Sequence, residues 1–256
     1  RYDGRRYDIN LWQVTDFVYK NKKMDELGKI KLFNADCMDI MRQYPDKYFE
    51  LAVVDPPYSD PNGDISGGKR FGERFDKYKK DGDEKQVCRT GGGYVAKYGK
   101  KIIDWDIAPK QDYFDELFRV SKNQIIWGGN YFALPPTRCF VVWRKTNISE
   151  NFSMAMAEYA WTSFHANAKV LALSSEGIPG RFHPTQKPVK LYEWIYHNYA
   201  NKGDKILDTH LGSGSSAIAA HNGGFDFTGI EIDTEYYNAA KKRIMERQRQ
   251  LELFEP

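Results

Sequence analysis

A short apolar run that is stopped by two prolines constrains this chain more than any other feature. Residues 51–54 (Leu-Ala-Val-Val) are typical of a buried strand in a parallel sheet. Pro56 and Pro57 lack the backbone N–H groups that a strand or helix needs, so the strand must end at Asp55. Open α/β folds bind their ligands beyond the carboxyl ends of such strands. The run therefore predicts a site in which Asp55 and Tyr58 are held close together.

The residues after this strand have the chemistry to hold a flat base by its exocyclic amine. The amine would donate its hydrogens to the Asp55 carboxylate and to the carbonyl of Pro56, while the ring of Tyr58 stacks on the base. An ordinary strand followed by a proline turn, with Asp55 as a cap, explains the same residues equally well. The rest of the chain has to decide between the two interpretations.

Length and composition describe one globular domain spanning residues 1–256. Of these residues 41% are hydrophobic and 29% charged, and the formal net charge of +3 permits a nucleic-acid-binding patch without requiring one. Aromatic residues make up 15%, which suits base stacking and core packing alike. Cys37, Cys88 and Cys139 are far apart in sequence, so we expect neither a metal site nor disulfides. Without an apolar run of transmembrane length or a signal peptide, we expect a cytoplasmic protein with no membrane contact.

Hydrophobic periodicity and proline or glycine stops predict alternating strands and helices along most of the chain. Strands are expected at 29–33, 51–54, 124–127, 139–143, 157–161, 170–173, 205–207 and 225–230. Helices are expected at 10–21, 37–43, 112–120, 189–199, 217–221 and from 234 onward. Asn10 and Asp36 are the expected caps of the first two helices.

Residues 59–104 break this pattern. Glycine-rich clusters alternate there with basic runs, and hydrophobic periodicity is nearly absent. A structureless loop of this length inside a compact domain is usually functional or disordered. We expect a mobile insertion in which Lys69, Arg70 and Arg74 bind a polyanion; the alternative is a surface loop with solvated charges.

The stretch 205–231 is the second informative block, with the order strand, small-residue loop, helix, strand and acid. Gly212 and Gly214 let backbone N–H groups approach a ligand closely. Glu231 follows the second strand, where a carboxylate suits a bidentate grip on ribose hydroxyls. Ala217 replaces the third glycine of the dinucleotide fingerprint, which disfavours a pyrophosphate site. We therefore expect a ligand that carries a ribose.

Together these motifs resemble those of the S-adenosylmethionine-dependent DNA amino-methyltransferases. Asp-Pro-Pro-Tyr at 55–58 precedes the Gly-Ser-Gly loop at 212–214, which is the circularly permuted order of the β group of that family. His-Pro-Thr-Gln-Lys-Pro at 183–188 and Gly-Ile-Glu at 229–231 also match, as does Ala-Asp-Cys at 35–37. The likeness covers roughly 30–58 and 183–245, and residues 105–132 are similar to phage-borne members.

The resemblance implies a Rossmann-like methyltransferase fold, an open, mostly parallel, twisted sheet with helices on both faces. It implies S-adenosylmethionine as cofactor, no metal, and double-stranded DNA as the partner whose target base is flipped out of the duplex. It also implies catalytic roles for Asp55, Pro56, Pro57 and Tyr58, and target recognition by 131–182. A homodimer and a restriction endonuclease partner are both compatible with it. The cofactor-binding residues that it implies are Asp36, Cys37, Thr185, Lys187, Asp208, His210, Leu211, Gly212, Ser213, Gly214, Ser215, Glu231 and Ile232.

The favoured reaction is methylation of adenine N6 in DNA, because cytosine-N4 enzymes of the family usually carry Ser in place of Asp55. A cytosine-N4 enzyme stays open, as does an RNA or protein-glutamine methyltransferase, although those relatives usually begin the tetrapeptide with Asn and place the cofactor loop first. A nucleoside-binding module without catalysis would leave the Asp-Pro-Pro-Tyr turn unexplained. One departure from the family is that Asp208-Thr209-His210 replaces its usual Asp-Pro-Phe. His210 either replaces the cofactor contact of that Phe with its ring face or is a hydrogen-bonded loop residue. We favour the second and expect no catalytic role for it.

Overall fold

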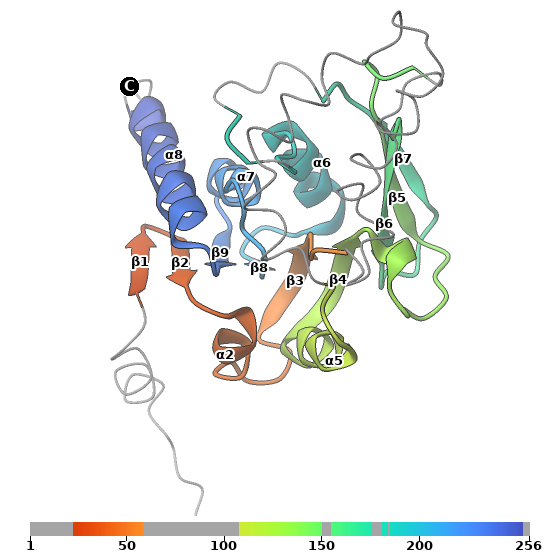
Figure 1. The fold of residues 1–256 in the computed structure, drawn as a ribbon, viewed down its shortest axis with the longest axis horizontal. Coiled ribbons are helices and arrows are strands. Elements are labelled where there is room, and N and C mark those ends of the chain that lie inside the picture. The colour runs from red at the N-terminus through yellow and green to blue at the C-terminus, as the bar shows by residue number, and fades with distance from the viewer. Residues whose placement is uncertain (1–22, 59–107, 150–154, 176–180, 184, 253–256) are drawn as a thin grey trace, which may run out of the picture.

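The computed structural model describes residues 23–58, 108–149, 155–175, 181–183 and 185–252 (Figure 1). The helix expected at 10–21 and all of the 59–104 insertion, with Lys69, Arg70 and Arg74, lie outside these residues. Their assignments therefore stay predictions.

The described residues form one nine-stranded sheet with the strand order β1-β2-β9-β8-β3-β4-β6-β5-β7. The strands are β1 (Lys23–Leu27), β2 (Ile30–Asn34), β3 (Phe49–Val54), β4 (Ser121–Trp127), β5 (Phe140–Arg144), β6 (Ala157–Thr162), β7 (Lys169–Ala172), β8 (Lys205–Asp208) and β9 (Asp226–Glu231). The five strands from β2 to β4 are parallel to one another, whereas β1 and β6 are antiparallel to their neighbours. The predicted mostly parallel α/β sheet is confirmed.

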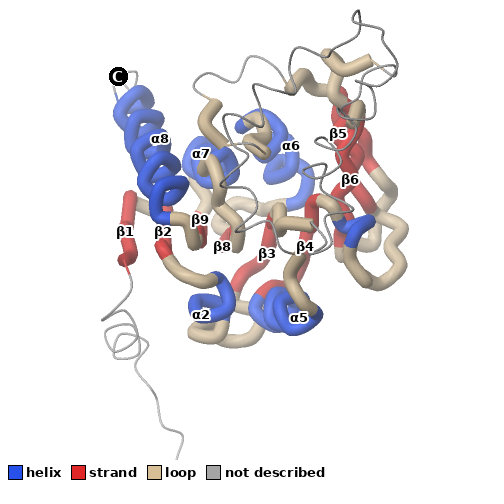
Figure 2. Tube along the Cα trace, in the orientation of Figure 1, coloured by secondary structure: helices blue, strands red, loops and turns tan. Residues whose placement is uncertain are grey.

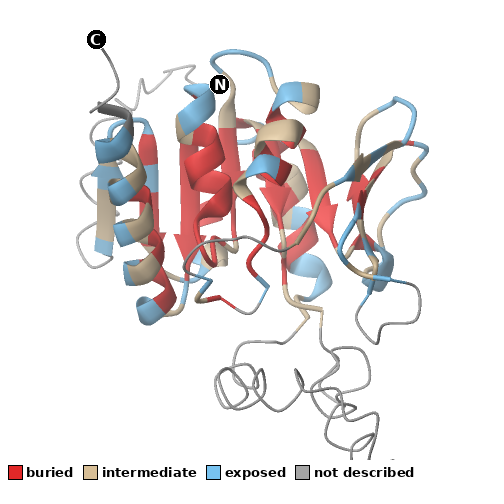
Figure 3. Cartoon of the chain, turned by 90° about the horizontal axis from the view of Figure 1, so that it is seen from above, coloured by how far each residue is buried: buried red, intermediate tan, exposed pale blue. Residues whose placement is uncertain are grey.

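Helices cover both faces of the sheet because the central strands are apolar on both sides. Leu51 and Val53 of β3 pack in the core beneath α6 (Val189–Tyr199), α7 (Ser215–Gly223) and α8 (Thr234–Glu252). Ala52 and Val54, which alternate with them, pack against α2 (Cys37–Met41) and α5 (Gln111–Val120). Figure 1 shows these two helical layers, and the buried residues concentrate in the central strands and in α7 (Figure 3).

Strand order, rather than sequence order, brings the two motif blocks together. β3 lies between β8 and β4, and β8 lies between β3 and β9. The register pairs Ala52 with Leu207 and Asp208 with Gly229, so these parallel strands end at one edge of the sheet. The trace in Figure 2 shows these central strands side by side, with helices on either side of them. This is the arrangement in which open α/β sheets bind ligands.

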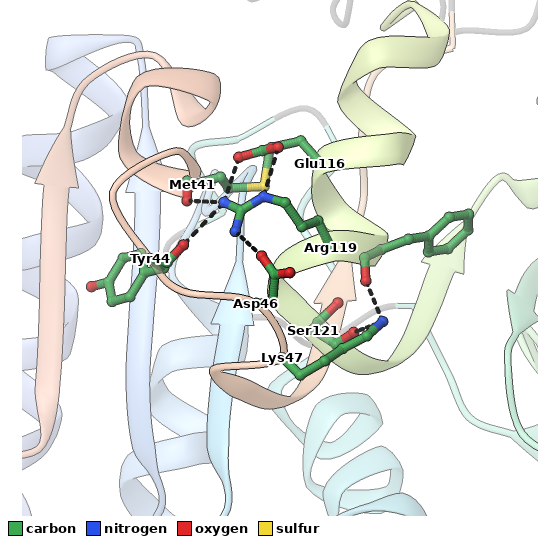
Figure 4. Close-up of polar contacts among 8 residues, drawn as sticks. Met41, Tyr44, Asp46, Lys47, Glu116, Arg119 and Ser121 are labelled. Carbon is green, nitrogen blue, oxygen red and sulfur yellow. Dashed lines mark hydrogen bonds and ion pairs between the residues drawn. The ribbon is translucent and has the colours of Figure 1, made fainter. Parts of the chain in front are cut away.

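At the opposite edge, two basic side chains fix α5 to the loop that leads into β3 (Figure 4). Arg119 pairs with Asp46 at 2.6 Å and donates to the carbonyls of Met41 and Tyr44 at 3.2 and 3.0 Å. Lys47 has a φ of 54° and its ammonium donates to two carbonyls at the end of α5, at 2.5 and 3.1 Å. These bonds satisfy the unpaired carbonyls of the helix end and fix the start of β3 relative to β4.

Two details differ from the sequence prediction. β1 was not predicted; it joins β2 through the two-residue turn Gly28-Lys29, with Gly28 at a φ of +63°. The helix that begins at Cys37 ends at Met41 rather than at 43, because its last carbonyls accept from residues three positions on. Among the described helices, none is both long and apolar enough to cross a membrane.

Candidate active site

Three acids follow or end neighbouring strands at the carboxyl edge of the sheet. Asp55 follows β3, Asp208 ends β8 and Glu231 ends β9. The helix that starts beside Asp208, α7, is preceded by the Gly212-Ser213-Gly214 loop. The proline turn, the small-residue loop and the terminal acid of the sequence analysis therefore share one edge of the sheet.

Asp55 is paired with a lysine from the second motif block. The ammonium of Lys187 contacts Asp55 Oδ2 and lies 3.3 Å from Glu158 Oε2. Burial raises the pKa of Asp55, while Lys187 acts in the opposite direction. Burial acts to lower the pKa of Lys187, but Asp55 and Glu158 hold it above its ordinary value, so the lysine is charged. We expected Lys187 on the cofactor, and the structure places its ammonium at the proposed catalytic acid.

The ring of Tyr58 is stacked on the ring of Tyr131. Their centroids lie 4.6 Å apart and their planes differ by 13°. Tyr131 ends the short 3-10 helix η1 (Gly129–Tyr131) and is 46% exposed. The turn before η1 contains Gly128 at a φ of +66°, where an added Cβ would lie 2.8 Å from Tyr58 Cδ1. A glycine is thus required for the backbone to pass this close to Tyr58.

The small-residue loop is fastened to Glu231. The backbone N–H of Gly212 donates to Glu231 Oε2 at 2.8 Å, and that of Asp233 donates to Oε1 at 2.9 Å. Gly212 has a φ of +52°, which turns its N–H toward the acid. Burial raises the pKa of Glu231, and these backbone bonds act against that rise. Each carboxylate oxygen keeps a lone pair with which to accept a hydroxyl of a ribose.

Asp208 organises the start of α7. It accepts hydrogen bonds from the Ser216 hydroxyl at 2.5 Å and from the His210 backbone N–H at 3.0 Å. Burial raises the pKa of Asp208 to about 7. Arg243 of α8 donates to the Ser213 carbonyl and the Ser215 hydroxyl, both at 2.9 Å. The residues of this loop, with the adjoining Leu211, are buried and held by the protein itself.

His210, which departs from the family pattern, is half-buried and contacts a chain of polar side chains that leads into the core. Its Nδ1 contacts the Thr209 hydroxyl at 2.9 Å, and that hydroxyl contacts the Tyr113 hydroxyl at 2.6 Å. The Tyr113 and His210 rings meet edge to face, 5.4 Å apart. Burial lowers the pKa of His210 to about 4, so the ring is neutral. A hydrogen-bonded loop histidine is the arrangement we expected.

The remaining predicted cofactor residues lie near this edge, with different degrees of exposure. Asp36 caps α2 by accepting from the Met38 N–H at 2.8 Å, and burial raises the pKa of Cys37 to about 12, which keeps its thiol neutral. Thr185 is exposed and contacts His183 Nδ1 at 3.2 Å. Ile232 is an apolar residue that is 62% exposed directly after Glu231. An exposed isoleucine beside this acid offers an apolar surface to a ligand.

Sequence reasoning missed four residues of this region, which are Trp127, Tyr131, Glu158 and Gln186. The indole Nε1 of Trp127 and the amide Nε2 of Gln186 are buried without a hydrogen-bond partner among the described residues. Such donors are costly unless a ligand or water satisfies them. Gln186 stands next to Lys187 in the quoted motif, but no pattern points to Glu158 or Tyr131. Over the described part of the chain, no group of three or more His, Cys, Asp or Glu side chains could hold a metal ion.

Comparison with known proteins found a family, curated relatives and solved structures that are similar to this chain. The N6/N4 family model described as DNA methylase matches residues 126–242. The Type II methyltransferase M2.DpnII of Streptococcus pneumoniae is 44% identical over 266 residues, covering 89% of this chain and 94% of that protein. M2.LlaDCHI of Lactococcus lactis subsp. cremoris, also a Type II methyltransferase, is 40% identical, covering 89% of this chain and 93% of that protein. The crystal structure of the M1.HpyAVI-SAM complex aligns with a TM-score of 0.48 at 20% identity, covering 84% of this chain and 98% of that one.

Proposed function

Because this chain belongs to the N6/N4 DNA methylase family, we propose that it transfers a methyl group from S-adenosylmethionine to the N6 amine of adenine in DNA. Enzymes of this family are DNA methyltransferases. The finer assignment to a permuted, β-group enzyme that uses Asp-Pro-Pro-Tyr is our inference from the motif order. It is supported by one observation above all, that Asp55 and the Gly212 loop lie at the same edge of the sheet.

The residues around β8 and β9 fit the cofactor. Glu231 presents a buried carboxylate with free lone pairs for ribose hydroxyls, and the exposed side chain of Ile232 follows it. Gly212 and Gly214 leave no side chain between the loop backbone and the ligand. When bound, S-adenosylmethionine supplies a methyl group on a positively charged sulfur, which is an excellent leaving group. The chain therefore has to bind the cofactor, orient the two reactants and exclude water.

The exocyclic amine is a poor nucleophile, because its lone pair is delocalised into the base. Asp55 accepts one amine hydrogen and the Pro56 carbonyl accepts the other, which favours a pyramidal nitrogen whose lone pair faces the methyl group. Tyr58 stacks on the base after it has left the duplex. Pro57 keeps this turn extended. Asp55 also favours adenine over cytosine as the substrate, since cytosine-N4 relatives usually carry Ser there.

DNA recognition is assigned to two further regions. Strand β6 lies beside β4, and β5 and β7 follow it in the sheet. We assign target recognition to these strands and their loops, within 131–182. Lys69, Arg70 and Arg74 of the 59–104 insertion bind backbone phosphates, and neutralising all three flattens the salt dependence of DNA affinity. A homodimer and a cognate endonuclease remain proposals that the motifs permit.

Nucleoside analysis tests the proposed reaction. The purified chain is incubated with unmethylated duplex DNA and methyl-labelled S-adenosylmethionine, and the DNA is digested for mass spectrometry. We expect label in N6-methyldeoxyadenosine. Label in N4-methyldeoxycytidine would support the second candidate within the family, and label confined to RNA or protein glutamine would reject DNA as the substrate.

A further inference from the structure

Four charged side chains of alternating sign run inward from the target-recognition strands to Asp55. Lys145, directly after β5, lies 2.6 Å from Glu158 Oε1 on β6. Glu158 Oε2 in turn lies 3.3 Å from the ammonium of Lys187, which contacts Asp55 Oδ2. The order is Lys145, Glu158, Lys187, Asp55, and it joins four segments that are distant in sequence.

Burial and shape hold the Lys187 ammonium in one place. Its side chain is only 5% exposed, and the ammonium lies 5.2 Å from the centre of the Trp127 ring. A buried ammonium is unfavourable unless opposite charges and hydrogen bonds surround it. Asp55 and Glu158 provide two such partners, and the ring face of Trp127 provides a third favourable contact. Lys187 therefore cannot leave Asp55 without giving up a set of compensating interactions.

The bond to Lys187 occupies only one of the two oxygens of Asp55. Within the described residues, Oδ1 of Asp55 has no hydrogen-bond partner, whereas Oδ2 is held by the ammonium. A carboxylate that is fixed through one oxygen can present the other in a defined direction. This is the requirement for an acceptor that must orient a target amine.

We propose that Lys187 is a positioning residue that fixes Asp55 with Oδ1 facing the target amine, and that Glu158 and Lys145 hold Lys187 in place from the recognition strands. This inference rests on the proposed function, in which Asp55 accepts from the amine. It gives Lys187 a role on the catalytic side of the site rather than on the cofactor. It also makes two residues of the 131–182 region part of the support of the catalytic acid.

Electrostatics give this role a signature that packing alone would not produce. The charged groups that act on Asp55 from the surrounding elements are Lys187, Glu158 and Lys145. Asp55 in turn acts to raise the pKa of the neighbouring Tyr58, Tyr113, Tyr192 and Asp208. Burial and Glu158 raise the pKa of Asp55, and Lys187 opposes them. Removing the lysine charge should therefore raise the pKa of Asp55 further, whereas removing the Glu158 charge should lower it.

The experiment compares Lys187→Met, Lys187→Arg and Glu158→Gln with Lys190→Met, which changes an exposed lysine in the first turn of α6. Single-turnover methyl transfer is measured from pH 5 to pH 9, S-adenosylmethionine affinity by calorimetry, and folding by thermal unfolding. For Lys187→Met we expect a rate lower by roughly 100-fold at neutral pH, the scale for a misplaced reactive group. The acid limb of its pH–rate profile should move to higher pH, with cofactor affinity close to that of the wild type. Lys187→Arg should recover part of the rate, and Glu158→Gln should move the acid limb to lower pH.

Two outcomes of the kinetic and binding measurements overturn the proposal. One is a Lys187→Met variant that is folded and loses cofactor affinity while its acid limb stays in place, which would return Lys187 to the cofactor site. The other is a Glu158→Gln variant whose pH–rate profile has an acid limb that moves to higher pH or does not move at all. A carbon-13 NMR titration of the Asp55 carboxyl, assigned with Asp55→Asn, reports the same coupling without any turnover. An unmoved titration in Lys187→Met rejects the inference, whereas absent methyl transfer by the wild type rejects the proposed function.

Discussion

Tyr58 and Tyr131 are stacked in parallel, with ring centroids 4.6 Å apart. A base between two aromatic rings needs stacking contact on both of its faces, which is about twice an ordinary stacking spacing, so no base fits between these rings as they lie. We interpret Tyr131 as the support of Tyr58, which leaves the opposite face of Tyr58 for the target base. Tyr131 thereby connects the Asp-Pro-Pro-Tyr turn after β3 to the Gly-Gly-Asn turn after β4.

We expect Tyr131→Ala to lower the rate of methyl transfer by roughly 2- to 10-fold, because an aromatic pair contributes about 0.5–1.5 kcal/mol. Tyr131→Phe keeps the ring and should stay close to wild type. Single-turnover rates and the fluorescence of 2-aminopurine at the target position measure chemistry and base flipping separately. Faster flipping in Tyr131→Ala would instead identify Tyr131 as an obstacle that the base displaces.

Gly128 is a second test of the same geometry. Gly128→Ala places a Cβ 2.8 Å from Tyr58 Cδ1 and 3.1 Å from Cε1, at a φ of +66°. Gly28→Ala is the matched control, because Gly28 has a φ of +63° with nothing within 4 Å of the added Cβ. Both variants should lose about 1–3 kcal/mol of unfolding free energy from backbone strain, measured by urea titration. Only Gly128→Ala should also lose methyl transfer, and equal activity of the two would show that Tyr58 needs no fixed position.

Glu231→Ala should weaken S-adenosylmethionine binding by roughly 1.5–3 kcal/mol, the range for a hydrogen bond to a charged group. Isothermal calorimetry measures this, with Asp226→Ala as control because Asp226 is an exposed acid at the other end of β9. Unchanged cofactor affinity in Glu231→Ala would show that another acid binds the ribose. Asp233 is the next candidate, although its carboxylate already accepts two backbone N–H groups at the start of α8, at 2.8 and 3.0 Å.

His210 should make stability depend on pH in a defined direction. Burial lowers its pKa to about 4 in the folded chain, whereas an unfolded histidine titrates near 6.5. As the pH falls from about 6.5 to about 4, the unfolded chain takes up the proton first, so stability falls by up to about 3 kcal/mol and then levels off. The contribution is fully present above about pH 6.5.

His210→Phe should remove this part of the pH dependence, and the exposed His197→Phe should not. The quantity to compare is the difference in unfolding free energy between wild type and variant at each pH, because other buried groups, among them His183 and Asp208, also make stability depend on pH. His183, with a pKa lowered to about 4 by burial, acts in the same direction as His210. Asp208, with a pKa raised to about 7, acts in the opposite direction. A difference that does not change with pH would contradict a neutral His210 in the folded chain.

The sequence predicted elements best where apolar periodicity and a stop signal coincide. The strand before the prolines lies within β3 (Phe49–Val54), and the helix after Pro188 has the predicted bounds Val189–Tyr199. β1 was not predicted because three of its five residues, Lys23, Asp25 and Glu26, are charged. It is the outermost strand of the sheet and pairs with only one neighbouring strand.

Contacts within the site were less predictable than the strands that carry them. Motif order placed Asp55 and Glu231 at strand ends, because parallel strands of one sheet share a carboxyl edge. Asp55 and Lys187 are 132 residues apart in sequence, and no spacing rule gives the direction of a lysine side chain in a proline-bounded turn. The position of Glu158 beside Lys187 depends on the pairing of β6 with β4 and β5, which brings together segments that are distant in sequence. Side-chain partners of this kind follow from tertiary packing and not from local pattern.

Single-turnover methyl transfer by Asp55→Asn tests the central claim most directly. The substitution keeps the size of the side chain and removes the charge that accepts from the target amine. With duplex DNA and saturating S-adenosylmethionine, we expect transfer to fall by at least 100-fold while the chain stays folded and cofactor affinity stays near wild type. Thermal unfolding should occur at a lower temperature, because the buried Lys187 ammonium loses one of its two acidic partners. Transfer at the wild-type rate by a folded, cofactor-binding Asp55→Asn chain would contradict the proposed site.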